Sequence, residues 1–401
     1  MAVPNGAEWF HVFLGLMAAG AIPAPLDPLE PEGAQAGAAR AIGARYLWRA
    51  GRLHPVGPRG RSQRRSDECL VKMTSGSSGA PRGLGATHAQ MAADGRQLCL
   101  SMGILPGDSN LAAIPLGYSY GLGNLVVPLL LQGTGVVCVS SVLPHALAAE
   151  AMRFRPTVFP AVPPILRALV ASDVPERSLS SLRLVLSAGS PLSPEVARAF
   201  AGKFGLRVHG FYGTSETGGI SFDASGEATL EGRSVGTPVA GVRIAFGRGG
   251  RFSVASPAVL GTGRFRPADR AELNTHGELV LLGRTDRVVK IAGRRVDLAE
   301  IESALKSVRG IRDAFAHVGA AADSPLCAAV ATDLPTPEVR RLVRTKLAPW
   351  KIPGRIIALA AFPESARGKT DARRLRQILS APRTVASIST LSSERQMSAP
   401  R

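Results

Sequence analysis

Apolar and polar residues alternate in two different periods through the middle of the chain. Residues 182–189 (LRLVLSAG) and 206–213 (LRVHGFYG) are apolar runs of strand length, and the first ends in small residues. Between them, residues 193–205 (SPEVARAFAGKFG) carry apolar side chains at helical spacing, with Ser193 placed to cap the helix and Gly205 to end it. A strand, a helix and a strand in this order predict a parallel sheet with helices packed on its faces.

Two further patterns lie downstream. Residues 232–282 form short strands separated by closely spaced turns, which predicts a β-rich subdomain. Beyond it, strand and helix patterns alternate again over a length sufficient for a separate small domain. We therefore predict an α/β protein with a large domain of parallel and mixed sheets and packed helices over 1–285, and a small α+β domain over 286–380. The tail 381–401 is rich in Ser, Thr and Arg and is predicted to be disordered.

Two long apolar runs need separate interpretation. Residues 10–22 resemble the apolar part of a signal peptide, but Glu8 and the absence of a basic residue before them argue against that, and the run is too short to span a bilayer. We expect a buried helix there and no membrane span. Residues 125–139 are interrupted by Pro128 and by two glycines, so we interpret this run as core strand and turn.

Composition narrows the class of protein. Hydrophobic residues make up 45% of the 401 positions, which is enough for the cores of two or more domains. The four cysteines are scattered, without a CxxC pair, so the sequence predicts neither a disulfide framework nor a zinc site, and a reduced cytoplasm is the expected location.

The chain is strongly basic, with a formal net charge of +18. Clustered Lys and Arg can bind the phosphates of nucleic acids. However, the sequence contains no aromatic-rich RNA-binding motif and no basic heptad region, and its most basic stretch, residues 40–65, lies among Gly and Pro as a solvated loop would. We therefore predict no dedicated nucleic-acid partner.

Glycines and hydroxyl residues are concentrated in residues 71–88 (VKMTSGSSGAPRGLGATH), between a strand-like and a helix-like pattern. Glycines let backbone N–H groups converge on an anion, and the Ser and Thr hydroxyls add donors suited to phosphate oxygens. The segment lacks the GK[ST] of a Walker loop. Taken alone, it is compatible with a phosphate-binding loop and with a plain turn.

Three other segments follow in a fixed order: GFYGTSETGG (210–219), GRTDRVVKIAGRRVDLAEIE (283–302) and FPESARGKTDARRL (362–375). Together with TSGSSGAPRG, they resemble the signature motifs of the adenylate-forming (AMP-binding) superfamily, which includes acyl-CoA synthetases, adenylation domains and luciferases. The segment 114–133 resembles the acyl-CoA synthetases in particular. The resemblance extends over nearly the whole chain, from about residue 7 to about residue 379.

The resemblance implies a reaction in two steps. A carboxylate attacks the α-phosphorus of ATP to give an acyl-adenylate and pyrophosphate, and a thiol, usually that of coenzyme A, then displaces AMP. The implied partners are ATP, Mg²⁺, coenzyme A and a small carboxylic acid of apolar character. Two alternatives stay open: transfer to the phosphopantetheine thiol of a carrier protein, and a truncated, inactive homologue that only binds nucleotide.

The resemblance also assigns roles to residues of this chain. Around the β- and γ-phosphates it places Thr74, Ser75, Gly76, Ser77, Ser78, Gly79 and Arg82. Along the nucleotide it places Gly189, Ser190, Pro191, Gly210, Phe211, Tyr212, Gly213, Thr214, Asp269, Arg284 and Arg295. Tyr212 would stack on adenine and Asp269 would hold the ribose hydroxyls. The simpler readings are a core aromatic for Tyr212 and a solvated surface acid for Asp269.

The remaining assignments concern catalysis. Lys369 would bridge the carboxylate and the α-phosphate, Ser215 would contact the α-phosphate, and Glu216 would bind Mg²⁺. Asp286 would be the hinge about which a mobile C-terminal domain rotates between the two steps. Ala292 and Gly293 would lie beside the thiol, and Tyr118 would line the acyl pocket. Lys369 could also be one more solvated base among many.

The chain departs from the family pattern at three places. Arg82 stands where the phosphate loop usually has lysine, which keeps the charge but alters the geometry. Tyr118 stands where these synthetases often have histidine, which is expected to reshape the acyl pocket. The phosphate loop also begins unusually early, near Thr74, so we expect an N-terminal portion of the large domain to be missing. A misplaced start codon, a natural truncation and a decaying gene all stay open as reasons.

Overall fold

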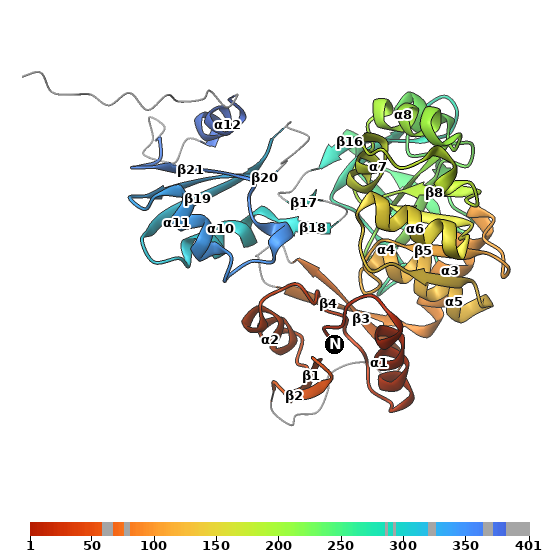
Figure 1. The fold of residues 1–401 in the computed structure, drawn as a ribbon, viewed down its shortest axis with the longest axis horizontal. Coiled ribbons are helices and arrows are strands. Elements are labelled where there is room, and N and C mark those ends of the chain that lie inside the picture. Colours follow the sequence, from red (N-terminus) through yellow and green to blue (C-terminus); the bar gives the residue numbers. More distant parts are fainter. Residues whose placement is uncertain are drawn as a thin grey trace, which may run out of the picture.

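The structure is a computed structural model that describes residues 1–57, 67–75, 81–284, 288–291, 294–319, 326–363 and 372–381. It has an α/β fold in two parts, which Figure 1 shows side by side, the small C-terminal part in blue. None of the described helices is long and apolar enough to cross a membrane.

A seven-stranded sheet organises the large part, with strand order β11-β10-β9-β8-β7-β5-β6. The strands from β5 to β9 pair in parallel, whereas β10 and β11 add to one edge in antiparallel orientation. The strands are β5 (Ser109–Ala112), β6 (Gly135–Cys138), β7 (Val158–Ala161), β8 (Leu184–Ser187), β9 (Val208–Thr214), β10 (Gly218–Phe222) and β11 (Thr237–Pro238). The sheet is therefore mixed, as predicted.

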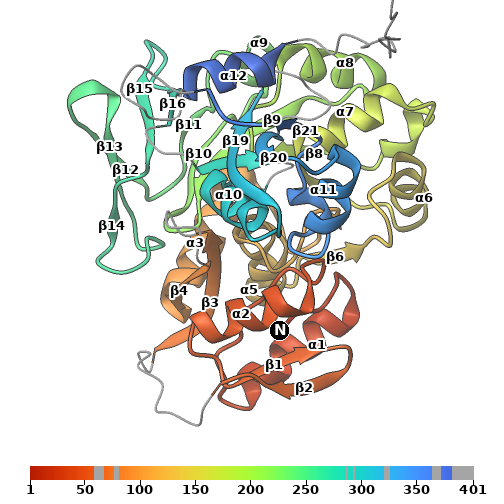
Figure 2. The same cartoon turned by 90° about the vertical axis from the view of Figure 1, so that its left-hand side faces the viewer.

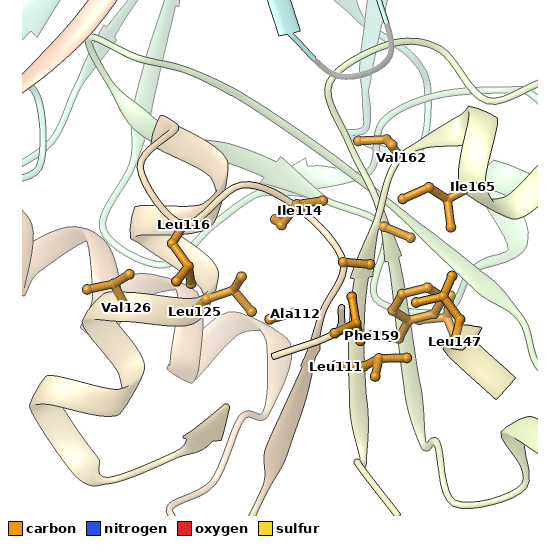
Figure 3. Packing of buried hydrophobic residues seen from close by; sticks show 14 of the residues in the cluster. Leu111, Ala112, Ile114, Leu116, Leu125, Val126, Leu147, Phe159, Val162 and Ile165 are labelled. Carbon is orange, nitrogen blue, oxygen red and sulfur yellow. The ribbon is translucent and has the colours of Figure 1, made fainter. Parts of the chain in front are cut away.

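Helices cover this sheet, and α8 (Pro194–Phe204) begins and ends at the residues expected from the sequence. In α8, the Ser193 hydroxyl accepts a hydrogen bond from the Val196 N–H, and Gly205 ends the helix at a φ of 67°. The other helices of this region are α3 (His88–Met102), α4 (Ser119–Gly121), the π-helix η1 (Leu122–Val126), α5 (Val127–Gln132), α6 (Pro144–Phe154), α7 (Pro163–Ala171), the 3₁₀-helix η2 (Glu176–Leu179) and α9 (Glu227–Glu231). Figure 3 shows side chains of this core, with Leu111 and Phe159 packed beside Leu147.

The interpretation of residues 125–139 as strand and turn was wrong for most of the run. Residues 122–132 are helical, and only Gly135–Cys138 form a strand. Pro128 lies in the first turn of α5, which continues directly from the π-helix η1, because Val126 and Val127 at the junction keep helical φ and ψ. Gly133 ends the helix at a φ of 78°, a conformation that favours glycine. Gly133 therefore marks the end of a helix, whereas Pro128 lies inside a continuous helical run, where η1 changes to α5.

The N-terminal residues form smaller elements, which lie at the bottom of the view in Figure 1. The apolar run near the N-terminus forms α1 (Ala7–Ala18), so the expected helix is present, but it is not buried all round: Trp9 and Phe13 are buried, whereas Leu14 is 41% exposed. The other elements are α2 (Glu32–Ala41) and the hairpins β1 (Tyr46–Arg49)–β2 (Arg52–Pro55) and β3 (Glu68–Ser75)–β4 (Pro81–Thr87).

The β-rich region that the sequence predicts is present in the large part. It comprises a three-stranded sheet and a separate hairpin. The elements are β12 (Arg243–Phe246), the 3₁₀-helix η3 (Arg248–Gly250), β13 (Phe252–Ala255), β14 (Arg264–Phe265), β15 (Asp269–Leu273) and β16 (Leu279–Arg284).

The small part has hydrophobic clusters of its own, formed by strands on one side and helices on the other. Its elements are β17 (Val288–Ile291), β18 (Arg294–Asp297), α10 (Leu298–Lys306), β19 (Ile311–Val318), β20 (Leu326–Thr332), α11 (Thr336–Val343), the 3₁₀-helix η4 (Pro349–Lys351), β21 (Arg355–Leu359) and α12 (Ala372–Ser380). Residues 285–287 and 382–401 lie outside the described residues, so the domain boundary and the disordered tail stay predictions.

Candidate functional site

A cavity of about 660 Å³ lies between the two parts of the fold. Its walls come from the N-terminal loop before α2, from β3, from the region of η1, from the carboxyl ends of β8 and β9, and from the β17–β18 hairpin and η4 of the small part. Ligands of open α/β sheets bind outside the carboxyl ends of parallel strands. The cavity therefore lies where the topology of the sheet favours a ligand.

Several predicted nucleotide residues lie just after β8 or within β9. Gly189 lines the cavity and has a φ of 92°, a backbone conformation that favours glycine. Phe211, Gly213 and Thr214 line the same cavity. Ser190 and Pro191 continue the turn after β8 but are not among the cavity-lining residues. Gly210 faces another way, because its N–H donates to the Thr229 hydroxyl at 2.8 Å.

Tyr212 and Asp269 are in direct contact, although they are far apart in the sequence. The Tyr212 hydroxyl donates a hydrogen bond of 2.9 Å to Asp269 Oδ2. The tyrosine is 5% exposed and belongs to a core cluster, and the Nζ of Lys290 lies 5.8 Å from the centre of its ring. Tyr212 is therefore packed as a core aromatic whose polar end meets the predicted ribose acid. Arg284 pairs with Asp269 across the β15–β16 ladder, so its backbone lies at the same place.

The β3–β4 hairpin carries the start of the predicted phosphate loop. Thr74 lines the cavity and pairs in register with Arg82, whose carbonyl accepts a hydrogen bond from the Thr74 hydroxyl at 3.4 Å. Because side chains alternate along strands, Lys72, Thr74 and Arg82 lie on one face of the hairpin. Ser75 is described by its backbone alone. Gly76, Ser77, Ser78 and Gly79 lie outside the described residues.

A turn between β9 and β10 carries Ser215 and Glu216. Ser215 is 9% exposed and lines the cavity, whereas Glu216 is half-buried beside it and is not among the lining residues. The turn is fixed from two sides: the Thr214 N–H donates to the Thr217 hydroxyl at 3.3 Å, and the Leu260 N–H donates to the Glu216 carbonyl at 2.8 Å. Ser215 and Glu216, the residues predicted to contact the α-phosphate and Mg²⁺, are therefore held at the carboxyl end of β9.

A buried charge cluster lies beneath this turn, and sequence reasoning missed it. Lys72 of β3 is 2% exposed and Asp94 of α3 is 3% exposed. Burial lowers the pKa of Lys72, against the opposing charges of Asp94 and Glu216, and burial likewise raises the pKa of Asp94, against the charge of Lys72. Asp94 Oδ1 also accepts a hydrogen bond from the Gly219 N–H at 3.0 Å. The cluster ties the phosphate-loop hairpin and α3 to the turn that carries Glu216.

The loop before α2 contacts the small part through Asp27. Asp27 Oδ2 accepts hydrogen bonds from the Tyr118 hydroxyl at 2.8 Å, from Arg294 Nη1 at 3.0 Å and from Trp350 Nε1 at 2.6 Å. All four residues line the cavity. Burial and the neighbouring Asp27 charge raise the pKa of Tyr118, so its hydroxyl stays protonated as a donor. Tyr118, predicted in the acyl pocket, therefore lies at the contact between the two parts.

A second acid of the same loop contacts the same region. Glu30 forms an ion pair with Lys351 and accepts a hydrogen bond from the Ala348 N–H at 3.2 Å. Lys351 also pairs with Glu300 at 2.7 Å. Burial alone would lower the pKa of Lys351, but the two carboxylates hold it above its usual value.

Other predicted residues of the C-terminal segment are described in part or not at all. Arg295 is described by its backbone, in β18 opposite Lys290. Asp286, Ala292, Gly293 and Lys369 lie outside the described residues. Ala292 and Gly293 connect β17 and β18, and the flanking residues Lys290 and Arg294 both line the cavity.

Comparisons with known proteins agree with the family resemblance that the sequence motifs indicate. The sequence profile of the family described as AMP-binding enzyme matches residues 55–246. A benzoate–CoA ligase from Thauera aromatica is 28% identical in an alignment of 351 positions that covers 78% of this chain and 66% of that protein. A probable CoA ligase from Humulus lupulus is 26% identical in an alignment of 343 positions that covers 76% of this chain and 62% of that protein. The chain thus spans less than two thirds of the length of these two relatives.

Among solved structures, an amide bond synthetase from Marinactinospora thermotolerans has a similar fold. It superposes with a TM-score of 0.80 at 24% sequence identity, over 94% of this chain and 89% of that one. At this level of identity the likeness concerns the fold, and it includes both the large and the small part.

Proposed function

Because this chain belongs to the adenylate-forming (AMP-binding) superfamily, we propose that it activates a carboxylic acid with ATP and transfers the acyl group to the thiol of coenzyme A. The observation that carries the proposal is the cavity, which is lined at once by the ends of β8 and β9, by Thr74 of the phosphate-loop hairpin and by the β17–β18 hairpin. A site shared in this way can hold a nucleotide against one part and a second substrate against the other.

In the first step, a carboxylate oxygen attacks the α-phosphorus of ATP and pyrophosphate leaves. Thr74 and the loop after it would bind the departing phosphates, and Ser215 would donate to an α-phosphate oxygen. Lys369 would neutralise the charge shared by the carboxylate and the α-phosphate in the transition state. Asp269 would hold the ribose hydroxyls, positioned by its hydrogen bond from Tyr212. These roles hold the reactants in line and offset charge, which are the main requirements of phosphoryl chemistry.

Mg²⁺ fits this site as an ion held mainly by ATP. Glu216 offers one carboxylate, and the described residues contain no group of three or more His, Cys, Asp or Glu that could hold a metal ion. Mg²⁺ commonly binds through one or two carboxylates together with substrate phosphates and water, which a single Glu216 satisfies. The bound ion would neutralise charge on the β- and γ-phosphates, while Lys72 and Asp94 support the turn on which Glu216 lies.

In the second step, the thiol sulfur attacks the acyl carbonyl carbon, the bond to AMP breaks, and a thioester forms. Ala292 and Gly293 would lie beside the incoming thiol. Support comes from Lys290 and Arg294, which flank these two residues and line the cavity. Asp286 would act as the hinge that exchanges this arrangement for the one in which Lys369 reaches the site.

The acid is expected to be apolar. Leu98, Val139, Tyr120 and Phe211 line the cavity together with Tyr118. Apolar walls favour an apolar acyl group, because burial of its surface stabilises the complex. We further propose that the protein works in the reduced cytoplasm, since all four cysteines are free and burial raises the pKa of Cys69 and Cys99 to about 11.

ATP–pyrophosphate exchange with a panel of aromatic and aliphatic acids tests the function. We expect acid-dependent exchange with at least one apolar acid, followed by thioester formation when coenzyme A is added. Folded protein that shows no exchange with any acid would contradict the proposal. Exchange without acyl-CoA, but with loading of a phosphopantetheinylated carrier protein, would identify the acceptor as a carrier thiol. ATP binding without exchange would identify an inactive nucleotide-binding homologue.

Replacing Tyr212 by phenylalanine tests the contact with Asp269. The ring and its packing are kept, but the hydrogen bond of 2.9 Å is lost. A typical hydrogen bond contributes about 0.5–1.5 kcal/mol, so we expect the KM for ATP in the exchange assay to rise about twofold to twelvefold. Tyr46→Phe is the matched control, since Tyr46 is 47% exposed and lies in β1. An unchanged KM in Tyr212→Phe would show that Asp269 does not need this contact to bind ribose.

A further inference from the structure

We propose that Asp27 is a positioning residue for the thiol-transfer step. Together with Glu30 it docks the small part onto the N-terminal loop, in the orientation that brings the β17–β18 hairpin to the cavity. This inference rests on the proposed function for the identity of the step, but the docking itself can be tested without any substrate.

Both oxygens of the Asp27 carboxylate accept hydrogen bonds, and the donors come from four segments of the chain. Its side chain is 6% exposed, and the side chain of Arg294 is 17% exposed. One oxygen accepts from Tyr118, Arg294 and Trp350, and the other accepts from the Leu29 N–H at 2.9 Å. A carboxylate buried with this many donors loses their hydrogen bonds when its surroundings are rearranged. Asp27 therefore selects a particular placement of Arg294 and Trp350.

Stacking contacts reinforce the same placement. The guanidinium of Arg294 lies 4.8 Å from the centre of the Trp350 ring and 5.3 Å from that of Tyr118. The ammonium of Lys351 also lies 5.2 Å from the centre of the Trp350 ring, while it pairs with Glu30. Cations over aromatic faces gain energy when they are shielded from water. The loop thus presents two acids, and the small part presents two cations close to one tryptophan.

These charged contacts determine orientation more than overall stability. A buried ion pair contributes little net stability, because its attraction is offset by the loss of hydration, but leaving one partner buried alone is costly. If the small part rotated away, Asp27 and Glu30 would regain water and could leave their partners at low cost. The contacts therefore favour one docked orientation and still allow its release.

The docked orientation presents the β17–β18 hairpin rather than the segment that carries Lys369. Arg294 directly follows Gly293 in the sequence, so Asp27 anchors the hairpin at the first residue of β18. By contrast, α12, which begins shortly after Lys369, packs on β19 and β20, and its described residues do not line the cavity. Figures 1 and 2 both show α2, just after the Asp27 loop, beneath α10. The orientation therefore fits the second step, in which the thiol would approach this hairpin.

Tyr118 links this docking to the acyl pocket. Its hydroxyl donates to Asp27, and its side chain lines the cavity beside Tyr120. Through one carboxylate, Asp27 therefore contacts both Tyr118, which is predicted to line the acyl pocket, and the small part. Loss of this carboxylate is expected to affect the step that needs both in place.

Two conservative variants test the inference. Asp27→Asn keeps the shape but removes the charge, and Trp350→Phe keeps a ring but removes the N–H donor. We expect each to lower single-turnover thioester formation from preformed acyl-adenylate about tenfold or more, while ATP–pyrophosphate exchange at saturating acid changes by less than about threefold. A looser acyl pocket around Tyr118 would raise the KM for the acid, whereas only the second step uses the docked contacts. The double variant should lose little more than either single variant, since both remove one contact. Asp173→Asn is the matched control, because Asp173 is 87% exposed and pairs with His145.

Acrylamide quenching of tryptophan fluorescence gives a readout independent of activity. The signal of Trp350 is obtained by subtracting the spectrum of Trp350→Phe, and we expect it to become more accessible in Asp27→Asn and to stay unchanged in Asp173→Asn. If the wild-type protein shows no ATP–pyrophosphate exchange with any acid of the panel, the proposed function fails. The quenching experiment still decides whether Asp27 docks the small part. Unchanged quenching in Asp27→Asn would overturn the inference. Equal losses in both half-reactions would also overturn it, since they indicate a general structural role.

Discussion

Replacing Lys369 by alanine is expected to lower acid-dependent ATP–pyrophosphate exchange by about 10²–10³-fold, the usual consequence of removing a group that stabilises transition-state charge. The carboxylate and the α-phosphate are both anionic, and their approach needs a compact positive charge between them. Lys369 lies outside the described residues, between β21 and α12, so the expectation rests on its place in the ARGKT motif. The measurement is initial-rate exchange at saturating ATP and acid.

The control and the companion variant separate charge from geometry. Lys306→Ala removes an exposed lysine of the same small part, at the end of α10, and should leave exchange unchanged. Lys369→Arg keeps the charge but replaces a point ammonium by a planar fork, so it should recover only part of the lost rate. Thioester formation from preformed acyl-adenylate should be largely retained in Lys369→Ala. Full exchange activity in that variant would show that another cation performs the first step.

Local signals in the sequence predicted the fold well where they agree with the tertiary environment. In α8 the hydroxyl of Ser193 caps the start of the helix and the positive φ of Gly205 marks its end, both as expected. The flanking strands β8 and β9 pair in parallel. The error at residues 125–139 has a physical reason. Gly133 suits the end of a helix as well as a turn, and Pro128 is accommodated inside a helical run where η1 changes to α5, and the sequence alone did not show either.

The candidate site was predicted only as far as it is built from contiguous motifs. Thr74, Ser215 and Thr214 belong to short segments with recognisable spacing, and all three line the cavity. Asp27 and Trp350 belong to no such segment, because their contact joins residues that are 323 positions apart. A hydrogen bond between distant positions leaves no periodic signal, so it becomes visible only when the chain is folded.

The buried charge cluster beneath Glu216 carries the largest expected effect on stability. Replacing Lys72 by methionine keeps the length and volume of the side chain but leaves Asp94 buried without its cation. Removing one partner of a buried pair costs about 3–5 kcal/mol, so we expect a corresponding fall in the free energy of unfolding. Urea denaturation followed by circular dichroism measures it as a lower midpoint.

A second substitution shows whether the loss comes from the unpaired charge. Asp94→Asn removes that charge while its side-chain oxygen can still accept the hydrogen bond from Gly219. The double variant Lys72→Met/Asp94→Asn should therefore regain most of the stability that Lys72→Met loses, whereas a simple packing defect would persist. Lys306→Met, at an exposed position, should shift the midpoint little. If Lys72→Met alone is as stable as wild type, Lys72 does not compensate the charge of Asp94, and the turn that carries Glu216 must be supported by its backbone hydrogen bonds instead.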